Sequence, residues 1–492
     1  VLVVAGVFGA PEQAGSQSLT YDFYDRGIHL AEFSILGDTT ASTHFTVRRR
    51  DLRNGTWGIT VAVPRDGQMD HPELEIGSLG NFARLGTISE IDWSALRVVA
   101  WPDTERVYVR HRELTKLVDG VSVAATRWAV PNQSNPIDLI VGGDNRFIAA
   151  IFPRSDHVLV RRGFEEFTSV HAWNRSTMSP AVHGYRQLAD VTMRARDGTR
   201  LATLVYLPDG PDSKGPFPTI LIRTPYGITN LIDVYENYPA RGYALVLQAT
   251  RANAYWDPQN QSEGTWNPMV AEAADGADAL EWVANQPWSD GGVCMEGGSY
   301  VAYTQWTASM AGNPALKCLI PNSSMGTAFS DQPYRGGGFV EGMAYYVFWM
   351  LNKELLPDRN WSDILHHRPL IDIDHYATGE DIEQWNTLLE HWRNDEYWQR
   401  EDWYRGPGPR NFATLQISGW FDDDVTGTQS NWDLMSRTSS EPQRLILGPW
   451  NHGFNSDRSL NGFHFGIDAI RDDIWLLKQK WYDRFLRGVE NG

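Results

Sequence analysis

The sequence predicts an α/β fold from about Asp190 onward, preceded by antiparallel β-structure. Before Asp190, short runs alternate apolar and polar residues and are separated by Gly, Asp, Asn and Pro turns. After it, apolar strands alternate with helix-length segments, which is the pattern of a mainly parallel sheet covered by helices. Because 492 residues exceed what one core accommodates, we expect several domains.

The expected division has a β-rich accessory domain at residues 1–185, an α/β domain in two parts at 186–325 and 409–492, and a helical insertion at 326–408 between those parts. The accessory domain carries no recognisable catalytic motif. Its charged residues are therefore expected on the solvated faces of half-buried strands.

The α/β domain begins with a predicted hairpin around Asp197 and Gly198 and continues with six apolar strands. The six are "PTILIR" from Pro218, "YALVLQ" from Tyr243, "GVCMEG" from Gly292, "LKCLIP" from Leu316, "FATLQIS" from Phe412 and "RLILG" from Arg444. Ligand sites of such sheets lie at the carboxyl ends of the strands. The insertion carries stretches such as "GMAYYVFWMLNKELL" without further strand alternation, so we expect a helical cap over that edge.

Composition and charge weigh against several classes of function. A formal net charge of -18 opposes binding to nucleic acid, and no stretch approaches the roughly 20 apolar residues that span a bilayer. The two cysteines, Cys294 and Cys318, cannot form a disulfide framework, and both are expected to be buried structural thiols.

The first ten residues, Val1–Ala10, leave the location of the protein open. "VLVVAGVFGA" fits the apolar core and small-residue end of a secretory signal as well as it fits a first β-strand. The first interpretation predicts a secreted or periplasmic protein, and the second a cytoplasmic one.

Three motifs fall at the ends of three predicted strands. Ser299 follows "GVCMEG", Asp422 in "SGWFDDD" follows "FATLQIS", and His452 in "GPWNH" follows "RLILG". The order Ser, Asp, His is that of α/β-hydrolases, in which an imidazole takes the serine proton and a carboxylate orients the imidazole. We therefore predict an α/β-hydrolase fold in which these residues form a catalytic triad.

Each motif also has a simpler interpretation. A serine after two glycines is commonly a plain turn residue, and His452 could be a hydrogen-bonded loop histidine. The acidic run 422–424 could be a solvated turn or a cation site. The joint arrangement at three strand ends favours the triad.

From about Asp190 to its end, the sequence resembles the cocaine esterase and X-Pro dipeptidyl-peptidase family. This CocE/NonD group also includes α-amino-acid ester hydrolases and glutaryl cephalosporin acylases. The resemblance rests on "RDGTRLATLVYLP", "IRTPYG", "TRANAYWDPQNQSEG", "ALEWVANQPWSDGGVCMEGGSYVAYTQW", "SGWFDDD", "LGPWNH" and "KQKWYDRFLRG". The group's nucleophile turn is commonly G-x-S-Y-x-G, so the departure in this chain is Ala302 in place of the second glycine.

The resemblance implies a role for each residue of the site. Ser299 is the nucleophile, His452 the base, and Asp422 the orienting carboxylate, with the next two aspartates as alternatives to Asp422. The backbone N–H of Tyr300 and the phenol of Tyr226 form the oxyanion hole. No cofactor is implied.

Two departures from the family pattern limit what can be carried over. Where many members have an Asp and a Gly flanking a Thr-Arg pair, this chain has Ala249 and Ala252; Arg251 is retained, and we expect it to be a structural ion-pair partner. The family also continues into a carboxyl-terminal jelly-roll domain, whereas this chain stops at Gly492. We expect that domain to be absent from this chain: it has been removed, a separate carboxyl-terminal chain supplies it, or the amino-terminal β-domain takes over its position. Possible partners are that separate chain and further copies of this one.

Two further groups of residues bear on ligands. The histidines outside the triad, including His366, His367 and His391, lack the spacing of a zinc site, so no metal is expected. Tyr345, Phe348 and Trp349 could line an apolar substrate pocket, although aromatic residues at helical spacing also suit a core.

The predicted function is a serine hydrolase that cleaves a carboxylic ester or amide bond of a small molecule through an acyl-enzyme. Alternatives are an X-Pro dipeptidyl aminopeptidase and a β-lactam side-chain acylase. Selectivity for a free amino group would require an acid near the site, such as Glu296. A catalytically silent binding module is the alternative of another class.

Overall fold

The computed structural model describes residues 19–36, 44–51, 57–64, 91–92, 97–100, 104–131, 134–143, 147–252, 255–405 and 410–492. The chain forms two compact units, one of Val1–Met178 with Asn455–Gln479 and the other of Ser179–Phe454 with Lys480–Gly492. Val1–Ala10, the candidate signal remnant, lies outside the described residues. Within the described ranges, no helix has the length and apolar character needed to cross a bilayer.

The first unit includes a segment that the sequence analysis assigned to the second part of the α/β domain. Residues Asn455–Gln479 belong to the first unit and not to the segment 409–492. The reason is a buried ion pair, because the Arg458 guanidinium donates to the two Asp138 carboxylate oxygens at 2.9 and 2.8 Å. A sequence pattern does not reveal such a long-range pair, so the expected boundary was placed without it.

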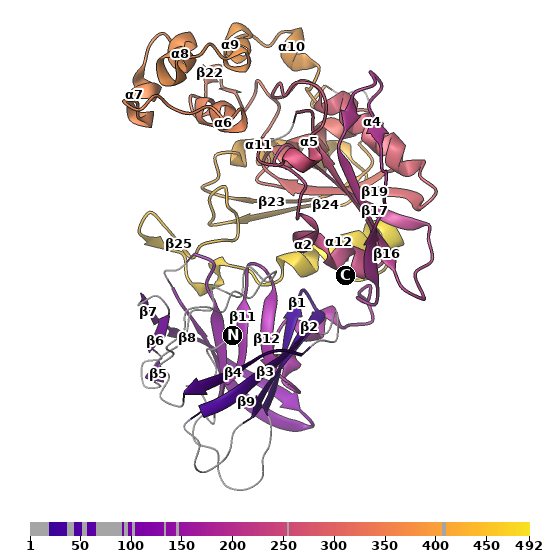
Figure 1. Cartoon of the computed structure of the whole chain (residues 1–492), viewed down its shortest axis with the longest axis vertical. Helices are drawn as coiled ribbons and strands as arrows, with labels where there is room; N and C mark the ends of the chain where they lie inside the picture. Colours follow the sequence, from indigo (N-terminus) through magenta and orange to yellow (C-terminus); the bar gives the residue numbers. More distant parts are fainter. Residues whose placement is uncertain are drawn as a thin grey trace. The chain divides into compact units, whose positions relative to one another are not determined.

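The first unit is built on a nine-stranded antiparallel sheet in the order β4-β3-β2-β1-β12-β11-β10-β9-β8 (Figure 1). Its strands are β1 (Leu19–Asp25), β2 (Ile28–Leu36), β3 (His44–Asp51), β4 (Trp57–Pro64), β8 (Val109–Val118), β9 (Val121–Ala129), β10 (Asp138–Gly142), β11 (Phe147–Phe152) and β12 (His157–Arg161). Its shorter elements are β5 (Ile91–Asp92), β6 (Arg97–Ala100), β7 (Thr104–Val107), α1 (Val170–Trp173), β25 (Ser459–Leu460) and β26 (Phe463–His464). The expected antiparallel β-structure is confirmed.

The second unit contains an eight-stranded sheet in the order β13-β16-β18-β17-β19-β20-β23-β24. Its strands are β13 (Gly184–Gln187), β16 (Thr203–Asp209), β17 (Phe217–Thr224), β18 (Ala244–Ala249), β19 (Ser289–Gly298), β20 (Leu316–Asn322), β23 (Ala413–Gly419) and β24 (Gln443–Gly448). In this order, every neighbouring pair from β18 to β24 is parallel, whereas β13 with β16 and β16 with β18 are antiparallel. All six predicted strands are present. The predicted hairpin is β14 (Met193–Arg194) with β15 (Arg200–Leu201).

Helices cover the parallel sheet, which explains why its central strands read as continuous apolar runs. Helices α4 (Glu272–Ala284) and α5 (Tyr300–Ser309) pack on β19, and α11 (Val425–Thr438) packs on β23 and β24. Every residue of β17, β18 and β23 is buried. Outside the insertion, the described part of this unit also contains α2 (Ile232–Tyr235), α3 (Asn237–Ala240) and the second part of α12 (Ile474–Arg487), whose residues up to Gln479 belong to the first unit.

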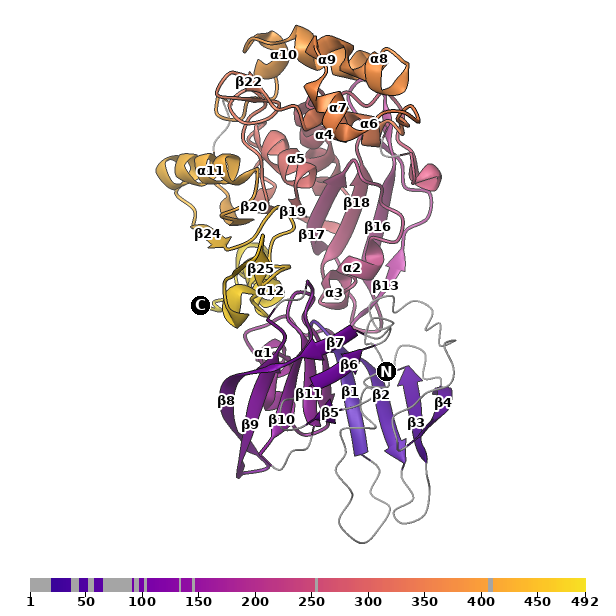
Figure 2. The same cartoon turned by 90° about the vertical axis from the view of Figure 1, so that its left-hand side faces the viewer.

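The insertion between β20 and β23 is largely helical. Its helices are α6 (Met343–Met350), α7 (Trp361–His366), α8 (Ile373–Thr378), α9 (Glu383–Glu390) and α10 (Glu396–Gln399). They gather at one end of the second unit (Figures 1 and 2). One short hairpin, β21 (Tyr334–Arg335) with β22 (Gly338–Phe339), precedes them, contrary to the expectation of no further strand.

The cysteines differ from their predicted state. Cys294 on β19 and Cys318 on β20 are paired in the parallel register, with Cα atoms 4.6 Å apart, and they form a disulfide. Both residues are fully buried, as expected, but neither is a free thiol. The prediction failed because spacing along the chain does not show which residues of neighbouring strands lie side by side.

Candidate active site

Ser299 occupies the sharp turn between β19 and α5. Its backbone has φ 60° and ψ -129°, a conformation that non-glycine residues rarely adopt. The turn is held because the Ser299 N–H donates to the Asn322 carbonyl at the end of β20, at 3.0 Å. Such a strained strand-to-helix turn is the geometry that exposes a nucleophilic serine above a parallel sheet.

The small residues around Ser299 allow the strand and helix to approach closely. A side chain at Gly297 would collide with Val301, because an added Cβ would lie 2.1 Å from its Cγ1. Ala302, the departure from the family pattern, is fully buried within the regular helix α5. The position therefore needs a small side chain and not a left-handed backbone, so alanine suits it.

Asp422 and His452 meet at the carboxyl ends of β23 and β24. The His452 Nδ1 lies 2.9 Å from the Asp422 Oδ1, and the Ser418 hydroxyl donates to the other Asp422 oxygen at 2.6 Å. The next two aspartates lie farther from the same ring nitrogen, at 3.3 Å for Asp423 and 3.7 Å for Asp424. Of the three, Asp422 has the shortest contact with the imidazole.

The two partners shift each other's pKa in opposite directions. Burial acts to raise the pKa of Asp422, but the hydrogen bonds from His452 and Ser418 outweigh it and lower the pKa to about 2. The hydrogen bonds to Asp422 and Asp423 raise the pKa of His452 to about 10. The pair therefore favours an ionised carboxylate next to a strongly basic imidazole.

Tyr226 lies beside the nucleophile, in the loop that follows β17. Its hydroxyl is 3.4 Å from the Ser299 Oγ, and it also interacts with the backbone N–H of Tyr300. Burial raises the pKa of Tyr226, which keeps the phenol protonated and able to donate. The two groups predicted as oxyanion donors therefore lie beside each other and next to Ser299.

Among the described residues, no hydrogen bond joins the Ser299 hydroxyl to the His452 ring, and the partner of that hydroxyl is Tyr226. The Ser299 turn and the His452 loop are nevertheless linked through the end of β20. The Ser299 N–H donates to the Asn322 carbonyl, and the hydroxyl of the next residue, Ser323, donates to the His452 carbonyl at 3.1 Å. Hydrogen bonds between nucleophile and base are often long in unliganded enzymes and shorten when substrate binds.

The three aromatic residues predicted for a substrate pocket lie in different surroundings. Trp349 is 40% exposed, and its ring centroid is 5.8 Å from that of Tyr226. Phe348 is buried and Tyr345 is exposed, and the rings of both contact Trp361. Only Trp349 of the three contacts the Tyr226 ring.

Sequence reasoning missed Trp256, which follows β18. Its ring lies 4.6 Å from that of Trp349, and its indole N–H donates to the Tyr226 carbonyl at 3.0 Å. The motif "TRANAYWDPQNQSEG" drew attention for its arginine and not for this tryptophan. Arg251 itself is the structural ion-pair partner that we expected, with Asp275 at 2.7 Å and Asp197 at 2.7 Å.

Glu296, the candidate for holding a substrate ammonium, has other partners. It is almost fully buried on β19, and the hydroxyls of Tyr238 and Tyr482 donate to its carboxylate. Its role is to bind these two phenols in the core.

Within the described ranges, two groups of three side chains have ligand atoms close enough to hold a metal ion. One is Asp422, Asp423 and His452, and the other is Asp22, His29 and Glu32. In the second group, Arg162 already pairs with both carboxylates, at 2.6 and 2.7 Å. Neither group has a further feature that points to an ion, so we assign no metal.

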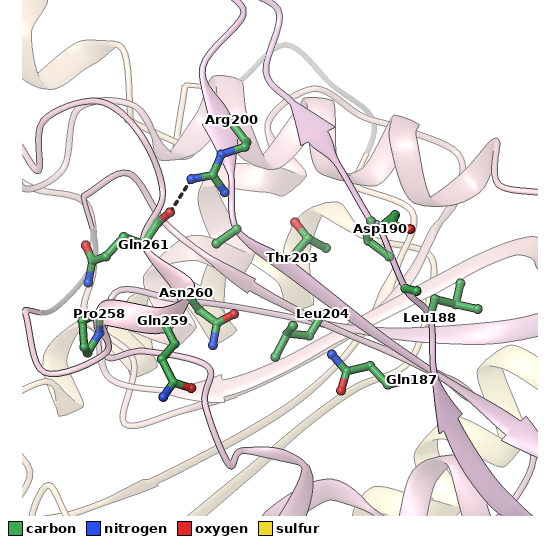
Figure 3. Close-up of a pocket in the computed structure, with 13 residues that line it drawn as sticks. Gln187, Leu188, Asp190, Arg200, Thr203, Leu204, Pro258, Gln259, Asn260 and Gln261 are labelled. Atoms are coloured by element: carbon green, nitrogen blue, oxygen red, sulfur yellow. Dashed lines mark hydrogen bonds between the residues drawn. The ribbon is translucent and has the colours of Figure 1, made fainter.

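A cavity of about 380 Å³ lies at the β13 and β16 edge of the second unit, lined by side-chain amides and by Asp190 and Arg200 (Figure 3). The guanidinium of Arg200 donates to the Gln261 carbonyl at 2.9 Å. None of the residues that we place in the active site lines this cavity. The candidate chemistry therefore lies elsewhere, around Ser299.

Comparisons with known proteins indicate the family of the chain. A family described as X-Pro dipeptidyl-peptidase (S15 family) matches residues 197–454. The chain is 28% identical over 339 residues to cocaine esterase of Rhodococcus, which covers 62% of this chain and 56% of that protein. It is 26% identical over 408 residues to a protein of Mycobacterium bovis whose name suggests a serine esterase, covering 68% of this chain and 62% of that protein.

The fold also matches a solved structure. An α-amino acid ester hydrolase superposes with a TM-score of 0.50 at 24% identity, covering 64% of this chain and 56% of that chain. This likeness supports the α/β-hydrolase fold alone. The chain spans less than two thirds of the length of the curated relatives described above.

Proposed function

Because the chain belongs to the X-Pro dipeptidyl-peptidase (S15) family, we propose that this serine hydrolase cleaves carboxylic esters through an acyl-enzyme. The observation that carries the proposal is the contact of 2.9 Å between Asp422 and His452 on neighbouring strand ends, with Ser299 in a strained turn close by. This combination matches the roles of orienting acid, base and nucleophile.

In the proposed mechanism, Ser299 attacks the ester carbonyl while His452 takes its proton. The Oδ1 of Asp422 accepts a hydrogen bond from the Nδ1–H of His452, which leaves Nε2 as the basic nitrogen and stabilises the imidazolium that forms. His452 then gives the proton to the leaving alcohol, and the acyl group stays on the Ser299 oxygen. His452 then takes a proton from a water molecule that attacks the acyl carbonyl, the bond to the Ser299 oxygen breaks, the carboxylic acid leaves, and His452 returns the proton to the Ser299 oxygen.

The oxyanion that forms during each attack needs hydrogen-bond donors. We assign this role to the phenol of Tyr226 and the backbone N–H of Tyr300, which both lie next to the Ser299 hydroxyl. We further propose that the helical insertion caps this site and that Trp349 and Trp256 form one apolar wall. Two rings 4.6 Å apart and about two fifths exposed would contact the substrate at little cost in ordering.

A second candidate is cleavage of a peptide after an X-Pro pair. The observation that favours it is the match of residues 197–454 to the X-Pro dipeptidyl-peptidase (S15) family. Asp424 is a poor partner for a substrate ammonium, because it is 2% exposed and already accepts a hydrogen bond from the side-chain amide of Gln332. Removal of an amide side chain from a β-lactam would use the same nucleophile and base.

The test is hydrolysis of phenyl acetate and of an Ala-Pro anilide by the wild-type chain and by Ser299→Ala. We expect phenyl acetate to be the better substrate, Ser299→Ala to be inactive on both, and a fluorophosphonate to label Ser299 stoichiometrically. Preference for the anilide would support the peptidase. A folded wild-type chain that stays unlabelled and inactive would instead indicate a binding module.

A further inference from the structure

The side chain of Tyr300 is held by two polar groups that the proposed mechanism does not use. Its hydroxyl accepts a hydrogen bond from the Met269 N–H at 3.0 Å and donates to the Glu272 Oε1 at 3.3 Å. Tyr300 is 1% exposed and is the first residue of α5. The two hydrogen bonds therefore hold the hydroxyl end of the Tyr300 side chain, while the backbone N–H at the other end of the residue lies beside Tyr226.

Both partners of the phenol are themselves constrained. Met269 is fully buried and has φ 65°, a left-handed conformation that is uncommon for a residue other than glycine. Strain of this kind persists where the surroundings enforce it and is frequent around active sites. The strained backbone directs its N–H at the Tyr300 hydroxyl.

Glu272 is a buried carboxylate with a cation of its own. Arg223, which is fully buried on β17, donates to the Glu272 Oε2 at 3.2 Å and to the Glu272 carbonyl at 3.1 Å. The other Arg223 contact is Gln248, at 2.8 Å. The carboxylate therefore has little freedom to leave the Tyr300 hydroxyl.

We infer that Glu272 and the Met269 N–H position Tyr300, so that its backbone N–H stays aimed at the oxyanion. Glu272 is thus a positioning residue that acts through Tyr300, at the amino end of α4. The physical reason is that an oxyanion donor works by being fixed before charge develops, and an error of about 1 Å costs on the order of a hundredfold in rate.

A matched residue on the same helix provides the control. Tyr303 is also fully buried on α5, and its hydroxyl donates to Glu401 at 3.4 Å, but its N–H lies inside the helix, away from the proposed oxyanion hole. Tyr300→Phe and Tyr303→Phe each remove one buried hydroxyl bonded to a buried glutamate. Only the first should disturb the oxyanion donor.

The experiment measures kcat and KM for phenyl acetate in five variants, with melting temperature as a check of folding. We expect Tyr300→Phe and Glu272→Ala to lower kcat about tenfold with KM changed less than about twofold, because the lost interaction acts in the transition state. Glu272→Gln keeps an acceptor for the phenol and should recover most of the rate. Tyr303→Phe and the exposed α4 control Glu281→Ala should stay within about twofold of wild type.

The possible outcomes separate this inference from the proposed function on which it rests. Equal kcat in Tyr300→Phe and wild type, or equal losses in Tyr300→Phe and Tyr303→Phe, would overturn the positioning role while Ser299 remains the nucleophile. If the wild-type chain neither hydrolyses the ester nor reacts with a fluorophosphonate, both proposals fail. If Glu272→Ala does not fold, Tyr300→Phe alone decides the outcome.

Discussion

Two buried acidic sites, one in each unit of the molecule, have different partners. In the first unit, Asp138 is fully buried and accepts hydrogen bonds from two guanidinium groups, those of Arg127 and Arg458. In the second unit, Asp422 and Asp424 are nearly as buried but face the imidazole of His452. A guanidinium keeps its charge at every ordinary pH, whereas an imidazole gains and loses a proton.

The difference teaches which buried charges hold a fold and which can take part in a reaction. A carboxylate paired with arginine has a fixed partner, so it can hold a fold or a neighbouring residue in place but does not move a proton. A carboxylate paired with histidine has a partner that can carry a proton between a nucleophile and a leaving group. Substitutions at these sites should therefore differ in their effects on activity and on stability.

The largest effect is expected for Asp422→Asn. The amide preserves the shape of the side chain but cannot stabilise an imidazolium, so kcat for ester hydrolysis should fall by about 10⁴-fold while the melting temperature changes little. The measurement is steady-state kinetics with phenyl acetate. Asp290→Asn, at the other end of β19 from Ser299, is the control and should leave kcat unchanged. A loss of less than tenfold in Asp422→Asn would transfer the orienting role to a neighbouring aspartate.

The next largest effect is expected for Tyr226→Phe. This change removes the hydroxyl 3.4 Å from the Ser299 Oγ and keeps the ring that contacts Trp349. Loss of one oxyanion donor should lower kcat by about a hundred- to a thousandfold with KM nearly constant. Tyr376→Phe, on α8 of the insertion, removes a hydroxyl from a residue outside the proposed site and serves as the control. Unchanged turnover in Tyr226→Phe would remove the phenol from the mechanism.

A smaller effect, on stability only, is expected for Asp138→Asn. Removal of the carboxylate leaves the buried guanidinium of Arg458 without an anion and that of Arg127 with Asp472 alone, which should lower the free energy of unfolding of the first unit by about 3 kcal/mol. Denaturation in urea measures this change, and kcat of the folded protein should be retained. The exposed Asp119→Asn, in the turn between β8 and β9, should have almost no effect. Loss of kcat in folded Asp138→Asn would contradict the assignment of a structural role.

The smallest effect concerns the pH dependence of activity. Since His452 acts as a base only when deprotonated, its pKa of about 10 predicts that kcat/KM rises with pH up to about that value. Asp423→Asn removes one anion that raises this pKa, so the rise should move to lower pH. The Asp423 side chain is 69% exposed, so solvent screens it and the shift should be about one pH unit or less. A shift to higher pH would contradict the electrostatic argument.

Much of the second unit could be predicted because its signals are local. Apolar runs bounded by turns marked all six strands, and the chemistry-bearing residues stood directly after three of them. Parallel strands bring their carboxyl ends to one edge of a sheet, so residues far apart in the chain could be expected to meet there. The contact between Asp422 and His452 follows from this rule.

Other features depend on contacts between segments that carry no local signal. The transfer of Asn455–Gln479 to the first unit depends on the pairing of Arg458 with Asp138. The Tyr300 hydroxyl is held by its hydrogen bond to Glu272, which in the sequence is one acidic residue at the start of a helix, as is common. Trp256 was equally inconspicuous until the structure placed its indole against the Tyr226 carbonyl.

The sequence by itself therefore determined the order of the strands along the chain, the nucleophile turn and the set of residues from which a triad could form. Tertiary structure decided which of three aspartates lies closest to His452, that Cys294 and Cys318 form a disulfide, and what holds Tyr300. The physical reason is the distance along the chain over which each kind of interaction acts. Backbone propensity and apolar periodicity act over a few residues, whereas register and buried ion pairs depend on which distant segments come together.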